Sequence, residues 1–134
     1  MNTVKKSQSE SKSGRVKNLL EYLYEIQEQV SFSAFEDEEK KQVRELCLII
    51  AEVMKLPDTY DVKINGEKLP ASIVKEVFDL IEMYHICHVL ENFSKLSYTV
   101  NHTKTYLRTA LYNSVFELEN KLENEVNGWM SNDK

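Results

Sequence analysis

Glycine and proline are scarce in this chain: three glycines and two prolines occur in 134 residues. Both residues interrupt helices, so their scarcity favours long helical segments over a fold built from many turns. The longest apolar run, residues 46–51, is far shorter than the roughly 20 residues that cross a bilayer as a helix. The sequence also has no glycine-rich phosphate loop and no nucleophile elbow, so we do not expect an enzyme.

Cysteine is almost as scarce, with only Cys47 and Cys87. Each lies in an apolar helical pattern and no secretory segment begins the sequence, so we expect reduced, buried thiols in a cytoplasmic protein. Cys87 stands between His85 and His88, which suggests a metal site. On a helix, however, Cys87 points about 100° away from His88, so the three side chains do not converge on one ion. We therefore expect no metal and no cofactor, with Cys87 a core thiol that the histidines flank.

Charge is unevenly spread along the chain. Residues 1–17 contain five Lys and Arg against one acid, whereas residues 18–134 contain twelve against twenty-one, so the net charges are +4 and −9. An acidic body argues against a protein that wraps duplex DNA, because phosphate neutralisation needs clustered cations. Residues 1–15 are rich in Ser and Lys and are expected to be a disordered basic tail or linker. Residues 131–134 are expected to be a disordered end.

Apolar residues recur at steps of three and four through residues 16–130, which predicts a single helical domain. The predicted helices cover residues 16–30, a segment that starts at EDEEKK and ends before Pro57, and residues 71–80, 83–95 and 101–127. The inward positions predicted for the first four helices are Val16, Leu19, Leu20, Leu23, Ile26, Val30, Val43, Leu46, Cys47, Ile50, Val53, Met54, Ile73, Val74, Val77, Phe78, Ile86, Val89, Leu90 and Phe93.

A single strand pattern lies near residues 60–69. Residues 60–64 alternate between polar and apolar, and Asn65-Gly66 is the dipeptide preferred in a two-residue type I′ turn. A lone hairpin is marginal in water, so it must pack against the helices. The sequence thus predicts a mainly α fold: a compact bundle of about five helices with one β-hairpin and a long C-terminal helix.

The C-terminal helix carries one apolar stripe along its whole length, and beyond Asn113 this stripe needs a partner. Antiparallel packing on the first helix of the same chain is one solution. Pairing of two chains across a two-fold axis is the other. We favour the first solution, and so a monomer over a homodimer. The candidate assembly stripe is Val115, Leu118, Leu122, Val126 and Trp129.

Aromatic and cationic residues alternate in residues 95–112, where no acidic residue occurs. This composition suits single-stranded nucleic acid, because rings stack on bases and cations follow the phosphates. Three Lys and Arg are few for that task, and tyrosines at helical spacing more often belong to the core or its rim. The candidate nucleic-acid or partner surface is Lys95, Tyr98, His102, Lys104, Tyr106, Arg108 and Tyr112.

An ordered series of segments runs from about residue 26 to residue 130: IQEQVSF, LIIAEVM, VKINGEKLPASIVK, MYHICHVLENF, VNHTKTYLRTALYNS and EVNGWM. In this order they resemble the C-terminal domain of the replication initiator A proteins of Gram-positive plasmids and conjugative elements. That domain is similar to the helical module of the primosomal proteins DnaD and DnaB of Firmicutes. Thr103, Leu107 and Leu111 keep the spacing of the Tyr-x-x-x-Ile-x-x-x-Trp motif of that module, but not its Tyr and Trp.

The resemblance implies a non-enzymatic interaction module of a plasmid replication initiator-like protein, contacting host replication (primosome) proteins. Two alternatives stay open. One is weak binding of single-stranded DNA through the 95–112 surface. The other is a helical oligomerisation or partner-binding protein unrelated to replication. No membrane partner is expected.

Overall fold

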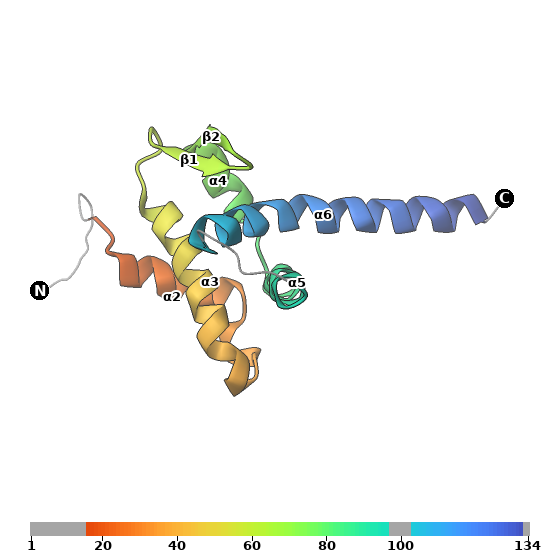
Figure 1. Cartoon of the computed structure of the whole chain (residues 1–134), viewed down its shortest axis with the longest axis horizontal. Coiled ribbons are helices and arrows are strands. Elements are labelled where there is room, and N and C mark those ends of the chain that lie inside the picture. The colour runs from red at the N-terminus through yellow and green to blue at the C-terminus, as the bar shows by residue number, and fades with distance from the viewer. Residues whose placement is uncertain (1–15, 97–102, 133–134) are drawn as a thin grey trace, which may run out of the picture.

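The structure, a computed structural model, describes residues 16–96 and 103–132, with side chains in the last helix described as far as Glu119. Within these ranges the elements are α2 (Leu19–Gln29), the short 3-10 helix η1 (Phe32–Ala34), α3 (Asp37–Lys55), β1 (Asp61–Ile64), β2 (Glu67–Pro70), α4 (Ala71–Phe78), α5 (Met83–Ser94) and α6 (Thr103–Asn132) (Figure 1). The predicted mainly α fold, with five helices and one hairpin, is confirmed.

Local sequence explains where the first helices begin. The Asn18 side chain accepts a hydrogen bond from the Glu21 N–H at 3.0 Å, and the Glu21 carboxylate accepts one from the Asn18 N–H at 2.9 Å. This reciprocal pair is a capping box, which satisfies two donors at the start of α2. Helix α3 instead begins with three acidic residues, 37–39, placed where the helix dipole is positive.

Helix α6 is the element on which the others assemble. In the described part of the chain, α3, α4, α5 and β1 all pack against it. Leu111, Ser114 and Val115 are the buried residues of its contact face. The Ser114 hydroxyl donates to the Leu111 carbonyl at 2.7 Å, so this buried polar group has a partner. Helix α2 joins the assembly mainly by packing on α3, and Gln29 at its end donates to the carbonyls of Phe78 and Ile81 at 3.0 and 2.8 Å.

Most of the predicted inward positions are confirmed, including every one in α3 except the half-buried Met54. Three positions were placed in the core wrongly: Val16, Leu20 and Ile73 are 84%, 51% and 43% exposed. Val16 precedes the first turn of α2, and the side of α2 that carries Leu20 is not covered, because α2 packs mainly on α3. Ile73 lies on a two-turn helix that buries only one face.

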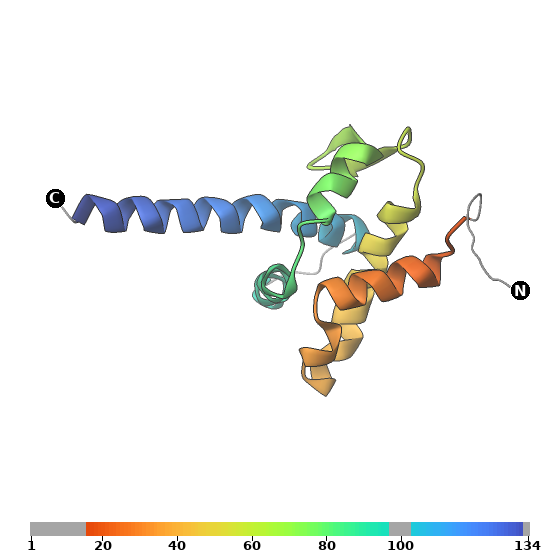
Figure 2. The same cartoon turned by 180° about the vertical axis from the view of Figure 1, so that it is seen from behind.

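The expected packing of the last helix on the first is wrong. Helix α2 packs on α3, while the C-terminal half of α6 runs away from the other elements in both views (Figures 1 and 2). Val115 is buried and Leu118 is half-buried, whereas the side chains of Leu122, Val126 and Trp129 lie outside those described. The helix reaches Asn132, so it continues past the predicted end at residue 127 and into the expected disordered end. Residues 1–15 and 133–134 lie outside the described ranges.

The hairpin depends on the helices, as expected. Val62 and Ile64 of β1 are buried, and β1 packs on α4 and α6. Asn65 and Gly66 have φ angles of 53° and 79°, and the type I′ turn needs both to be positive. The side-chain amides of Asn65 and Asn113 exchange two hydrogen bonds of 3.0 and 3.1 Å. The turn is therefore fastened directly to α6.

Replacing Gly66 with valine should lower the free energy of unfolding by about 1–3 kcal/mol, because a β-branched residue is strained at positive φ. A Cβ at this position would meet nothing within 4 Å, so the loss arises from the backbone rather than from a clash. Urea unfolding of Gly66→Val measures it. Gly66→Asn is the control and should lose much less, since asparagine tolerates the left-handed region. Equal stability of the valine variant and the wild type would contradict the turn geometry.

Candidate functional site

The structure places Lys104, Arg108 and Tyr112 at steps of four along one side of α6, whereas Tyr106 lies on the side of α6 that faces α5. Tyr98 and His102 lie outside the described ranges. Lys95, at the end of α5, forms an ion pair with Glu91 at 3.7 Å. Lys104, in the first turn of α6, forms one with Glu52 of α3 at 2.8 Å. Two of the three candidate cations thus already have a carboxylate partner from their own chain.

The remaining candidates also face inward or toward carboxylates. Arg108 lines a small cavity of about 190 Å³ whose walls include Glu52 and Asp61, and its Nε is buried without a hydrogen-bond partner among the described residues. Tyr112 packs against the core with its ring 5.3 Å from that of Phe116. Tyr106 points instead toward α5.

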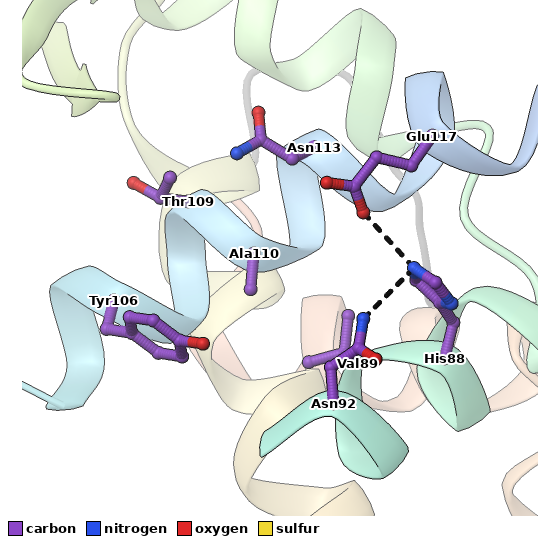
Figure 3. Close-up of a pocket in the computed structure, with 8 residues that line it drawn as sticks. All are labelled: His88, Val89, Asn92, Tyr106, Thr109, Ala110, Asn113 and Glu117. Carbon is purple, nitrogen blue, oxygen red and sulfur yellow. Dashed lines mark hydrogen bonds and ion pairs between the residues drawn. The ribbon is translucent and has the colours of Figure 1, made fainter. Parts of the chain in front are cut away.

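Tyr106 belongs to a cleft between α5 and α6 (Figure 3). The cleft has a volume of about 160 Å³, and its walls are His88, Val89, Asn92, Tyr106, Thr109, Ala110, Asn113 and Glu117. Nε2 of His88 lies 3.1 Å from the Glu117 carboxylate and 3.2 Å from the Asn92 amide nitrogen. One ring nitrogen cannot donate to Glu117 and accept from Asn92 at once, so a proton on Nε2 selects the Glu117 contact.

The α5–α6 cleft is suited to holding two helices together rather than to binding a substrate. Small-molecule sites usually have volumes of about 300–1,000 Å³, well above that of this cleft. His88 of α5 already bonds to Glu117 of α6 across the cleft. Glu117 lies on α6 and is not among the candidate residues that the sequence predicts. The contact with His88 depends on how α5 crosses α6, which helical periodicity does not specify.

A groove of about 610 Å³ lies between α2 and α3. The exposed Leu20 and the half-buried Leu48 form its apolar surface, above the buried Leu23, and its charged residues are Lys40, Lys41, Arg44 and Glu45. Lys40 bonds to Asp37 at 3.3 Å. Among the residues described, Lys41 and Arg44 form no ion pair. We call this feature the α2–α3 groove. Helical periodicity does not reveal it, because Leu20 fits the predicted core stripe.

The cysteines differ from the expectation in one respect. Cys47 is buried as expected, and burial raises the pKa of its thiol to about 12, so it stays protonated at neutral pH. Cys87 was expected to be a core thiol, which is wrong: it is exposed, and His85 takes the buried place. Within residues 16–96 and 103–119, no three His, Cys, Asp or Glu side chains are grouped so that they could hold a metal ion.

His85 is a structural residue at the start of α5. Its Nδ1 accepts a hydrogen bond from the Glu82 N–H at 2.9 Å, so this nitrogen carries no proton. Burial lowers the pKa of His85 below its usual 6.5, and nearby His88 lowers it further, while the Glu82 carboxylate acts in the opposite direction. The imidazole is therefore held neutral where it caps the helix.

The fold and its surfaces define a class: a small, mainly helical domain with an open apolar groove and a projecting helix. None of its described helices is both long enough and apolar enough to cross a membrane. The chain belongs to DUF6017, a family of unknown function whose sequence model matches residues 3–133. Neither a curated protein nor a solved structure matches the chain.

Acidification should destabilise the domain through His85. Its pKa is lower in the folded state than the 6.5 expected after unfolding, so the unfolded chain binds more protons below that pH. Stability should therefore fall as the pH drops from about 6.5 toward the folded-state pKa. Melting temperatures measured between pH 7.5 and 5 test this. His85→Gln keeps an acceptor for the Glu82 N–H but cannot titrate, so its profile should be flatter; an equally steep profile would contradict the assignment.

Proposed function

We propose that this chain is a non-enzymatic interaction module of a plasmid replication initiator-like protein, and that it binds host replication (primosome) proteins in the cytoplasm. The single observation that carries the proposal is the α2–α3 groove. The replication context rests on the sequence resemblance over residues 26–130.

The α2–α3 groove has the features of a site for an acidic amphipathic segment. Leu20 is 51% exposed beside Leu23 and Leu48, so an apolar partner would cover surface that water now contacts. Lys41 and Arg44 at the groove lack ion pairs within the described chain, and they would meet acidic side chains at the rim of the contact. A helix laid into a groove is a common mode of peptide recognition.

Single-stranded DNA binding has less support from the geometry. Lys95 and Lys104 are paired with Glu91 and Glu52, and Arg108 lies beside Glu52 and Asp61. A phosphate backbone would have to displace these carboxylates, which would offset part of the electrostatic gain.

The proposal predicts binding that depends on the α2–α3 groove. The purified chain is immobilised, and the helicase, the helicase loader, DnaD and DnaB of a Firmicute host are passed over it one at a time. At least one should bind, and Leu20→Glu and Arg44→Glu should each weaken that binding by roughly tenfold or more. Lys68→Glu, an exposed cation on β2, is the matched control and should have no effect.

Two results would contradict the proposal. One is the absence of binding to any of the four host proteins. The other is binding that Leu20→Glu and Arg44→Glu leave unchanged. Tight binding of a fluorescent oligonucleotide that drops on Lys104→Ala would favour the single-stranded DNA alternative instead.

A further inference from the structure

The C-terminal half of α6 runs away from the other described elements (Figures 1 and 2). Among the side chains described as far as Glu119, Val115 is buried and Leu118 is half-buried. The sequence of residues 115–132 continues the stripe with Leu122, Val126 and Trp129. It also contains four glutamates against one lysine. This half of α6 is therefore an acidic helix with one apolar side.

The α2–α3 groove is complementary to that helix in charge, and both carry apolar residues. Its exposed Leu20 and half-buried Leu48 match the apolar stripe, and its three cations outnumber its one glutamate. The lengths also agree. Residues 115–132 span about 27 Å as a helix, and the eleven residues of α2 span about 16 Å, so the helix can cover the whole groove.

We propose that the C-terminal half of α6 docks in the α2–α3 groove of a second copy of this chain, and that two copies exchange these helices reciprocally as a two-fold dimer. Reciprocal exchange fills both grooves and covers both helices. A one-way contact would leave a free groove at one end and a free helix at the other, and it would grow into a filament. This inference rests on the proposed function in one respect, namely that the groove binds an amphipathic helix.

Other occupants fit less well. The helix cannot reach the groove of its own chain while its first half is held on α3, α5 and β1 and its second half points away from them. The N-terminal residues 1–15 carry net positive charge, like the groove itself. Direct pairing of two α6 helices along the stripe would bring acidic residues of both chains together, which is repulsive.

Charge-reversal substitutions in the full chain, followed by sedimentation equilibrium, test the proposal. The wild type should form a dimer that weakens at high salt, because screening reduces the attraction. The groove variant Lys41→Glu/Arg44→Glu and the helix variant Glu119→Lys/Glu123→Lys should each weaken the dimer by roughly tenfold or more. All four substitutions combined in one chain should restore it. The exposed Glu76→Lys on α4 is the control and should leave the dimer unchanged.

A wild type that stays monomeric at every concentration would overturn the proposal. So would a dimer that responds to the helix variant but not to the groove variant, because that result indicates α6–α6 pairing. Failure here and failure of the proposed function are distinguishable. If the chain is monomeric but its groove variants lose binding to a host protein, the proposed function holds and the helix exchange does not. If the combined substitutions restore the dimer but no host protein binds, the helix exchange holds and the proposed function does not.

Discussion

Burial of one face of α6 between residues 107 and 115 is the interaction on which the rest of the structure depends. Leu111, Ser114 and Val115 are buried there against α3, α4, α5 and β1. The hairpin would be marginal without this face, and its turn is also hydrogen-bonded to α6 through Asn113. Helix α2 packs mainly on α3, with Gln29 bonded to the carbonyls of Phe78 and Ile81, so α2 keeps an open side. The same packing that completes the core thus leaves the α2–α3 groove accessible.

The sequence predicted the features that depend on near neighbours in the chain. Periodicity identified the five helices. Asn65-Gly66 identified the turn, because a type I′ turn needs two consecutive positive φ angles and these two residues tolerate them. Features that depend on the arrangement of the helices were missed. Leu20 fits a helical stripe, yet only the position of α3 decides how much of that stripe is covered. Cys87 was expected to be buried, but His85 is buried instead. The cause is similar, since the hydrogen bond from the Glu82 N–H satisfies the buried imidazole.

The same limit applies to the long helix and to the candidate site. An apolar stripe shows that a partner is needed, but it does not say which helix supplies it. Residues 95–112 contain the right side chains for a nucleic-acid surface, yet Lys104 meets Glu52, which lies fifty-two positions earlier in the sequence. If the α2–α3 groove accepts both a second copy and a host protein, self-association and partner binding compete for one surface. Protein concentration would then control which of them occurs.

Amide hydrogen exchange along α6 measures whether the first half of this helix belongs to the core while the second half does not. In dilute, monomeric protein, amides of residues 107–118 should be protected as strongly as those of α3, and amides of residues 120–131 should exchange much faster. Raising the protein concentration should slow exchange in the second half and in α2. Protection at the level of the core along the whole of α6 in the monomer would contradict the account, because it would show that the second half packs on its own chain.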